Sequence, residues 1–455
     1  MKILRKSSII LLVFSLLFCL AVFTACDETE VKPMKLSEYV VVIPKDATTT
    51  VRYAAENLVL LIEEKTGIVL PIVDDSTAES SKEILIGETN RQESQITAEL
   101  GAQQYTLFMK NEKIVMQGSG IYVGAACGDF INKYTTSLWG FRIIDVTNVP
   151  TEETVLTYAT TEQAKSVIFM IGDGMGENHI LMAEGNGLDG FAAKEFPFSG
   201  WSVTRSLSVI NKESSATDSA ASGTAMATGY KTLNGYIGID KEGQSILNVR
   251  ELAALAGAKT GVITTDVITG ATPSAFMCHQ QSRNDTDELT AQIDALVSNG
   301  KIDYCKGDVS DELTNELKAS LKTLSAGGST FFLMLEEGKI DKASHSKEEK
   351  KAIGYVIRFD DAIEYATQFA LCHPDVALVV TADHETGKLL EAPIKYAEYG
   401  YRFRSDAHTN VDVPIYAIGA GTSVLDGVTI ENIELARFCA KAFSSEHFGQ
   451  TEPVE

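Results

Sequence analysis

The sequence predicts two α/β units, the larger of them a mostly parallel sheet with helices on both faces. Its 455 residues exceed the usual size of a single domain. From Ser166 onward, apolar strand-like runs alternate with amphipathic helical stretches, which is typical of a parallel sheet covered on both sides. Strand and helix signals before Pro150 form a smaller unit, and the Thr- and Glu-rich residues 149–165 are expected to link the two.

The first 25 residues have the pattern of an export signal, with basic residues, an apolar run and a small-residue cleavage site. Cys26 follows directly, which resembles a bacterial lipoprotein signal in which this cysteine carries the lipid. Phe23 is a less usual residue at its position, so an ordinary signal peptide and an uncleaved anchor stay open. Each interpretation places the protein outside the cytoplasm, and the favoured one tethers it to the bacterial cell surface or periplasmic membrane through the lipid alone.

Charge and cysteine content exclude several kinds of partner. The formal net charge is −23, so the surface does not attract nucleic acid or anionic membrane. Cys19 belongs to the signal, and the remaining cysteines show no CxxC spacing and predict no zinc site. A Cys278–Cys305 disulfide stays open.

Residues 36–148 are expected to form the small α/β domain. The expected elements are strands at 39–43, 69–73, 83–86, 105–109 and 113–117 and helices from Val51 to Gly67 and from Ile121 to Tyr134. The segments YVVVIPKDATTTVRYAAENLVLLIEEKTGIVLPIVDD and EILIG resemble the accessory α/β domain found beside catalytic domains of several carbohydrate-active enzymes. That resemblance implies a structural role or a contact with glycans.

In the expected catalytic domain, residues 166–443, polar side chains repeatedly follow the end of an apolar strand. They are Asp173 after 167–171, Thr272 after 261–265, Glu336, Asp341 and His345 after 331–335, and Asp383 and His384 after 377–380. Sites in open α/β sheets lie at the carboxyl ends of the strands, so these groups should converge. Each one alone is explained by capping or turn formation, but their repetition favours a functional site.

The segment ESSATDSAASGTAMATG, residues 213–229, predicts a close-packed helix. Thr217 or Asp218 would be its N-cap, which places Ser219 in the first turn. There the Ser219 Oγ would lie among unpaired N–H groups at the positive end of the helix dipole, a setting that suits a phosphate group. Taken alone, the segment is better explained by close helix packing than by a nucleophile.

Six segments of the larger domain resemble the alkaline phosphatase family and follow in that family's order. They read VIFMIGDGMG, TDSAASGTA, ATPSAFMCHQQSR, EEGKIDKASH, VVTADHE and DAHTN, within residues 166–425. The resemblance implies the family's α/β fold and the hydrolysis of small phosphate monoesters through a phosphoserine intermediate on Ser219.

The resemblance also implies a site for two zinc ions and one magnesium ion. One zinc would bind Asp341, His345 and His408, the second Asp173, Asp383 and His384 with Ser219 facing it, and the magnesium Asp173, Thr272 and Glu336. Imidazole with carboxylate suits zinc, and an all-oxygen set suits magnesium. Arg283 would grip two phosphoryl oxygens, and Lys342 would lie near the phosphate as in bacterial members, unless it is a solvated lysine.

The chain departs from the family pattern in a few places. Gly270 stands where many members have an Asp or His that reaches the magnesium shell, which weakens the expected third-metal site. Glu337 is expected to be exposed, with metal binding as the alternative, and Asp360 and Asp361 are expected to form a solvated face. The short segment between Thr386 and His408 leaves little room for an interface insert, so a homodimer is left open.

Two other functions stay open. One is a phosphodiesterase or nucleotide pyrophosphatase of the same superfamily, which the magnesium set and the serine argue against. The other is a glycan-binding surface lipoprotein without catalysis, which the intact metal set argues against. A sulfatase would have a Cys/Ser-x-Pro-x-Arg segment, and Ser219 lies in none. Residues 444–455 lack apolar periodicity and are expected to form a mobile tail.

Overall fold

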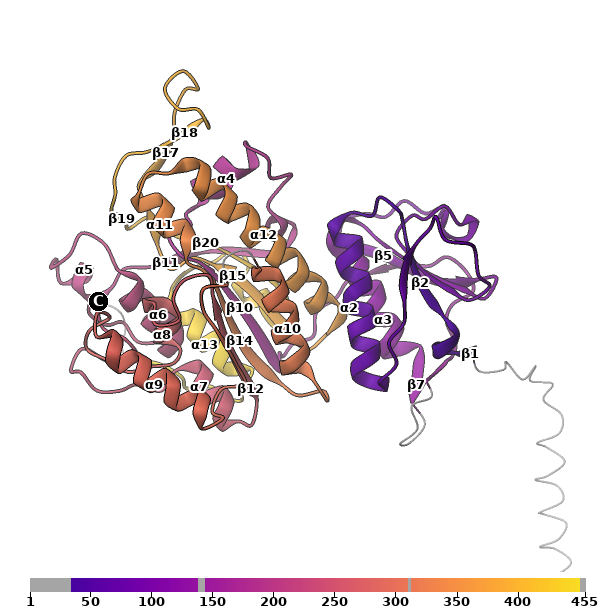
Figure 1. The fold of residues 1–455 in the computed structure, drawn as a ribbon, viewed down its shortest axis with the longest axis horizontal. Helices are drawn as coiled ribbons and strands as arrows, with labels where there is room; N and C mark the ends of the chain where they lie inside the picture. Colours follow the sequence, from indigo (N-terminus) through magenta and orange to yellow (C-terminus); the bar gives the residue numbers. More distant parts are fainter. Residues whose placement is uncertain (1–33, 138–143, 310–311, 451–455) are drawn as a thin grey trace, which may run out of the picture.

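The structure is a computed structural model that describes residues 34–137, 144–309 and 312–450, and it contains two α/β units (Figure 1). The expected export signal, residues 1–25, lies outside the described residues, as do Cys26 and residues 451–455 of the expected tail. Among the residues that are described, no helix is both long and apolar enough to cross a membrane.

The N-terminal unit contains a six-stranded sheet in the order β3-β2-β4-β6-β5-β9. Its strands are β2 (Val40–Ile43), β3 (Ile72–Asp74), β4 (Glu83–Ile86), β5 (Gln104–Lys110), β6 (Lys113–Gly118) and β9 (Val155–Thr157); β1 (Met34–Lys35), β7 (Thr135–Ser137) and β8 (Ile144–Val146) form a second, small sheet. The predicted hairpin is confirmed, because β5 pairs antiparallel with β6 around Asn111 and Glu112, both with positive φ. Strand β9 comes from the segment expected as a linker and pairs with β5.

Two helices cover one face of this sheet and face the larger unit. Helix α2 (Thr49–Thr66) is capped by the Thr48 hydroxyl, which accepts from Val51 N, and it ends at Gly67 with φ of 70°. Helix α3 (Val123–Lys133) follows the short 3-10 helix η3 (Gly120–Tyr122). Figure 1 shows both helices between the N-terminal sheet and α12 (Glu349–Cys372), against which they pack.

The larger unit is built on an eight-stranded sheet in the order β13-β12-β14-β10-β15-β20-β11-β21. Its strands are β10 (Ser166–Gly172), β11 (Phe198–Val203), β12 (Lys259–Thr264), β13 (Tyr304–Lys306), β14 (Phe331–Glu337), β15 (Val376–Thr381), β20 (Val413–Gly419) and β21 (Thr429–Glu431). Strands β13 to β15 in that order are parallel, and β20 runs antiparallel to both of its neighbours. The mostly parallel sheet predicted from the sequence is therefore confirmed.

Helices cover both faces of the large sheet, as predicted. One layer contains α4 (Glu177–Glu184), η4 (Ala192–Glu195), α10 (Leu313–Ser325), α11 (Lys339–His345) and α12, and the other contains α6 (Ser219–Thr228), α7 (Val249–Leu255), α8 (Ala271–Ala275), α9 (Thr286–Ser298) and α13 (Ile433–Lys441). The short elements α5 (Leu207–Ile210), η5 (Thr422–Leu425), β16 (Glu385–Thr386), β17 (Leu389–Glu391), β18 (Tyr401–Phe403) and β19 (His408–Thr409) lie in the connections. The first layer shares one apolar core with α2 and α3, so the two units are packed together.

The prediction of a solvated face at Asp360 and Asp361 is wrong. Helix α12 is covered by the N-terminal unit as well as by its own sheet, so few of its faces reach water. Asp360 is buried and accepts a hydrogen bond from Ala192 N at 2.7 Å, and Asp361 accepts from the Tyr53 hydroxyl at 2.8 Å. Asp360 thus joins α12 to η4, and Asp361 joins α12 to α2 of the N-terminal unit.

Part of the expected tail is packed. Phe448 is buried, and Gln450 N donates to Gly229 O at 2.9 Å at the end of α6. The cysteines of the described residues are free thiols, so the Cys278–Cys305 disulfide is not formed in this structure.

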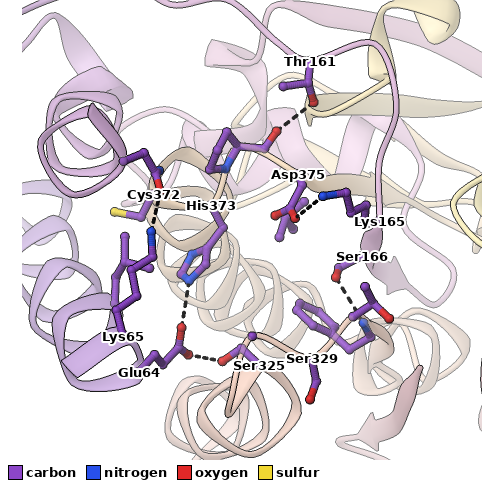
Figure 2. A pocket seen from close by; sticks show the side chains of 17 residues that line it. Glu64, Lys65, Thr161, Lys165, Ser166, Ser325, Ser329, Cys372, His373 and Asp375 are labelled. Carbon is purple, nitrogen blue, oxygen red and sulfur yellow. Dashed lines mark hydrogen bonds and ion pairs between the residues drawn. The ribbon is translucent and has the colours of Figure 1, made fainter. Parts of the chain in front are cut away.

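Figure 2 shows a cavity where the two units meet, at the amino ends of β10, β14 and β15. Glu64 from α2 accepts a hydrogen bond from the Ser325 hydroxyl and lies 3.3 Å from His373 Nε2. Lys65 Nζ donates to Asn132 Oδ1 at 2.6 Å beside it. The opposite, carboxyl ends of the same strands carry the residues of the candidate site.

Candidate active site

The first site residue follows the central strand β10. Asp173 N donates to Glu337 O at 3.1 Å, which anchors the turn to the end of β14. Gly174 has φ of 74°, and a Cβ on it would lie 2.7 Å from Thr386 Oγ1 and 3.0 Å from Asp341 Cβ. Only glycine tolerates both the positive φ and these close contacts. The glycine therefore allows the turn that carries Asp173 to pack against the segments of Asp341 and Thr386.

Ser219 is the first residue of α6, and Asp218 is its N-cap, as the sequence predicts. The Asp218 carboxylate accepts from Ala221 N at 3.0 Å. The Ser219 side chain is buried, and its Oγ lies 3.2 Å from His384 Nε2. The hydroxyl therefore lies at the positive end of the helix dipole.

Asp218 has a second contact that the sequence analysis missed. Its Oδ2 accepts from Gly235 N at 3.0 Å and lies 3.1 Å from Arg283 Nη1. The guanidinium is thereby held beside the start of α6. Because an arginine offers five N–H donors, this contact leaves others for a ligand. The sequence shows an acidic N-cap directly before the serine. It does not show that the partner of this carboxylate is Arg283, which lies 65 residues further along the chain.

Asp341, His345 and His408 come together at one edge of the site. One carboxylate oxygen and one nitrogen of each ring lie within 4.8 Å of one another. His408 Nδ1 donates to Thr217 O at 2.9 Å and His345 Nδ1 donates to Asp406 O at 2.5 Å, since a carbonyl only accepts. Both rings thus carry a proton on Nδ1 and turn Nε2 toward the carboxylate. The two Nε2 atoms lie 3.0 Å from each other and 3.3 and 3.4 Å from Asp341 Oδ1, so these three atoms surround one position for an ion.

A second group lies around His384. Its Nε2 is 3.1 Å from Asp383 Oδ2 and 3.7 Å from Asp173 Oδ1. Ligand atoms of Asp173, Asp341 and His384 also lie within 4.8 Å of one another. The structure therefore brings together the residues expected to bind the second zinc and places Asp341 between the two groups.

The residues expected to bind magnesium are buried beside the second group. Thr272 lies in α8 and Glu336 in β14, and both side chains are 1% exposed. Glu336 accepts a hydrogen bond from the Thr264 hydroxyl, and burial raises the pKa of Glu336 to about 8.

Two buried oxygens of these sets, Asp173 Oδ1 and Thr272 Oγ1, have no hydrogen-bond partner among the described residues, whereas Asp383 Oδ2 contacts His384 Nε2 at 3.1 Å. Buried polar atoms are normally paired, so each requires an explanation. Carboxylate and hydroxyl oxygens are suitable ligands of divalent cations, and the donor sets therefore fit the metals that the sequence implies.

The charges of the site also favour the binding of metal cations. Burial and the neighbouring charges of Asp383, Asp341 and Glu336 raise the pKa of Asp173 well above its usual value. Burial also acts to raise the pKa of Asp341, but the hydrogen bond from His408 and the adjacent histidine charges outweigh it and hold this pKa low. Carboxylates that repel one another in a closed site favour the binding of cations.

Three neighbours of the site differ from expectation or were missed. Glu337 is buried in a bidentate ion pair with Arg358, so the prediction of an exposed side chain is wrong. Thr386, which the sequence analysis overlooked, donates to Asp341 Oδ1 and lies 3.2 Å from His384 Nδ1. Its position two residues after His384, in the short strand β16, was the only signal of this contact in the sequence. Lys342 Nζ contacts Asp266.

A family model described as alkaline phosphatase matches residues 164–317 and 306–401, which is more than half of the chain. The chain belongs to the alkaline phosphatase family. The match lies within the larger unit and covers all of the site segments except the one that carries His408.

Curated alkaline phosphatases match over part of their length. Alkaline phosphatase 4 of Bacillus subtilis is 29% identical over 289 residues, which span 50% of this chain and 62% of the relative. The alkaline phosphatase of Escherichia coli is 33% identical over 204 residues, 44% of this chain and 42% of the relative. The chain thus spans about three fifths or less of the length of these relatives.

Solved alkaline phosphatase structures share the fold. The enzyme from the Antarctic bacterium TAB5 is 25% identical with a TM-score of 0.56, and the match covers 62% of this chain and 99% of that enzyme. A variant of the TAB5 enzyme with magnesium bound in its M3 site matches at 24% identity with a TM-score of 0.56, over 64% of this chain and 100% of the variant.

Proposed function

We propose that this protein is a metal-dependent phosphate monoester hydrolase in which Ser219 is the nucleophile. The observation that carries the proposal is the position of the Ser219 Oγ, buried at the start of α6 and 3.2 Å from His384 Nε2. The unpaired N–H groups of the first helical turn favour a negatively charged phosphoryl group at this point.

The reaction would proceed in two displacements at phosphorus. In the first, the Ser219 Oγ gives up its proton and forms a bond to phosphorus while the bond to the alcohol oxygen of the substrate breaks. The alcohol leaves with a proton, and a phosphoserine remains. In the second, a water oxygen gives up a proton and attacks phosphorus, the bond to Ser219 Oγ breaks, the serine oxygen takes up a proton, and inorganic phosphate is released. Splitting one hydrolysis into two transfers is the advantage of a covalent nucleophile.

Two zinc ions and one magnesium ion, when bound, would supply the positive charge that stabilises the attacking and leaving oxygens. Asp341, His345 and His408 would hold one zinc. The second zinc would be held by Asp173, Asp383 and His384. Asp173, Thr272 and Glu336 would hold the magnesium, which accounts for two of the unpartnered buried oxygens.

Arg283 would position the phosphoryl group. Its Nη1 lies 3.1 Å from the carboxylate of Asp218, the residue directly before Ser219, so the guanidinium is held near the nucleophile. The planar fork of the remaining N–H donors matches two phosphoryl oxygens. Lys342 would add positive charge near the same group from α11.

The variant Ser219→Ala tests the nucleophile. We expect p-nitrophenyl phosphate hydrolysis to fall by several orders of magnitude, because the covalent step is lost. Acid quenching with 32P-labelled substrate should label the parent protein but leave the variant unlabelled. The matched control is Ser298→Ala, which removes an exposed hydroxyl on α9 and should keep both signals. Labelling of Ser219→Ala would contradict the proposal.

Comparison of ester classes tests the substrate. The same protein should hydrolyse p-nitrophenyl phosphate much faster than bis-p-nitrophenyl phosphate. A preference for the diester would instead favour a phosphodiesterase or nucleotide pyrophosphatase. Glycan binding without hydrolysis of either ester would favour the non-catalytic alternative.

We further propose that the protein is exported and attached to the bacterial surface through a lipid on Cys26. This rests on residues 1–26 of the sequence alone. Metabolic labelling with a fatty acid should mark the full chain but not Cys26→Ala. Release of an unlabelled parent protein into the medium would overturn the tether.

A further inference from the structure

Gly270 leaves the expected magnesium set one residue short, and the structure places another carboxylate beside that position. Gly270 is the N-cap of α8, and a Cβ on it would lie 3.3 Å from Asp266 Oδ2 and 3.0 Å from Val267 O. The Asp266 carboxylate thus borders the space that a side chain at position 270 would enter.

Asp266 also lies against Glu336, one of the expected magnesium ligands. Asp266 N donates at 2.9 Å to the Thr264 hydroxyl, which itself donates to Glu336 Oε2. A Cβ on Gly338 would lie 3.0 Å from Asp266 Cβ and 3.4 Å from Glu336 Oε2. The side chains of Asp266 and Glu336 therefore lie close together, on either side of Gly338.

The carboxylate of Asp266 is held from two sides. Its Oδ1 accepts from Val267 N at 2.7 Å and forms an ion pair with Lys342 Nζ. The Lys342 side chain is 57% exposed and that of Asp266 is 18% exposed, so the pair lies between the protein interior and solvent. Because Lys342 directly follows Asp341 in α11, this ion pair connects the segments that carry Thr272 and Asp341.

Two further observations indicate a ligand at this place. Thr272 Oγ1 and Asp173 Oδ1 are both buried without a hydrogen-bond partner among the described residues. The two residues are 1% and 8% exposed, so water does not substitute freely. The group is therefore more than a set of acidic side chains, since it contains a neutral hydroxyl that an oxygen-binding cation would satisfy.

We propose that Asp266 replaces the acidic or histidine residue missing at position 270. It is a positioning residue: its carboxylate adds negative charge and a hydrogen-bond acceptor around a magnesium ion held by Asp173, Thr272 and Glu336, and its ion pair holds Lys342 beside that carboxylate. The inference rests on the proposed function, because it assumes that the third metal site exists.

The test is magnesium binding, measured without turnover. Zinc-loaded parent protein and Asp266→Asn are titrated with Mg2+ by calorimetry, and with Mn2+ as a paramagnetic substitute. We expect the variant to bind about 10–100-fold more weakly, the usual effect of removing a group that supports metal ligands. Asp294→Asn, which removes an exposed carboxylate from α9, should bind like the parent.

Two more variants separate this role from a general loss of structure. Lys342→Met removes the positive charge beside Asp266, so Mg2+ affinity should rise, opposite in sign to the effect of Asp266→Asn. Gly270→Asp added to Asp266→Asn should restore at least about tenfold of the lost affinity. The backbone conformation accepts aspartate, because φ at Gly270 is −54° and aspartate is a favourable N-cap. The new Cβ would lie 3.0 Å from Val267 O, so the loop must shift slightly to accommodate it.

The outcomes decide the inference. Weaker binding by Asp266→Asn with recovery in the double variant supports it. Unchanged Mg2+ affinity of Asp266→Asn overturns it while leaving the proposed function intact. A parent protein that hydrolyses monoesters with zinc alone and binds no Mg2+ also overturns it. A parent without monoester hydrolysis under any metal overturns the proposed function instead.

Discussion

The ion pair between Glu337 and Arg358 should be a large contributor to the stability of the larger unit. Arg358 Nε donates to Glu337 Oε2 at 2.7 Å and Nη2 donates to Oε1 at 2.8 Å. The Glu337 side chain has no exposed surface, and that of Arg358 is 16% exposed. Substitution Arg358→Met would remove both charge-assisted bonds and leave the carboxylate buried.

The expected cost follows from what remains around the carboxylate. Breaking a buried pair by removing one partner typically costs about 3–5 kcal/mol. Glu337 would keep hydrogen bonds from the Thr265 hydroxyl at 2.8 Å and from Lys339 N at 3.0 Å. We therefore expect a loss at the lower end, about 3 kcal/mol in the free energy of unfolding.

Urea unfolding of the full chain at one fixed zinc concentration would measure this loss. The double variant Glu337→Gln/Arg358→Met should recover at least about half of it, because no buried charge is left alone. Arg402→Met, which changes an exposed arginine on β18, should shift the midpoint little. A loss below about 1 kcal/mol for Arg358→Met would refute the argument that the pair is desolvated.

Three other changes have defined outcomes. Ser222→Ala removes a hydroxyl that donates to Asp383 O at 2.6 Å. Zinc affinity, measured by competition with a chelator, should fall about tenfold because Asp383 is less firmly held. Unchanged zinc affinity would show that Ser222 does not position Asp383. Burial raises the pKa of Asp360 from 3.8 to about 7, so the folded state holds this proton more tightly and its stabilisation is lost as pH rises through 7. Asp360→Asn should therefore gain stability relative to the parent as pH rises from about 4 to 7, on the order of 2 kcal/mol or more, and a pH-independent difference would contradict this. EDTA should abolish monoester hydrolysis and lower the Tm, both restored by zinc, because the buried carboxylates then lack their cations; a Tm insensitive to EDTA would count against structural coupling of the metals.

The sequence alone determined much of the fold and the identity of the candidate ligands. Alternating apolar runs predict the parallel sheet because the period of each element is a local property. The cap at Asp218 and the glycine at 174 are likewise local, since they depend on backbone geometry within a few residues. Polar residues after strand ends converge because parallel strands end at one edge.

Only the tertiary structure decided which charged groups face one another. Asp218 with Arg283 and Asp266 with Lys342 are pairs of residues from distant segments, and no periodicity in the sequence connects them. Asp360 has the spacing of an exposed helix face, but it is buried because a second unit packs on α12. Periodicity reports whether a face is polar; whether water reaches it depends on what the rest of the chain places there.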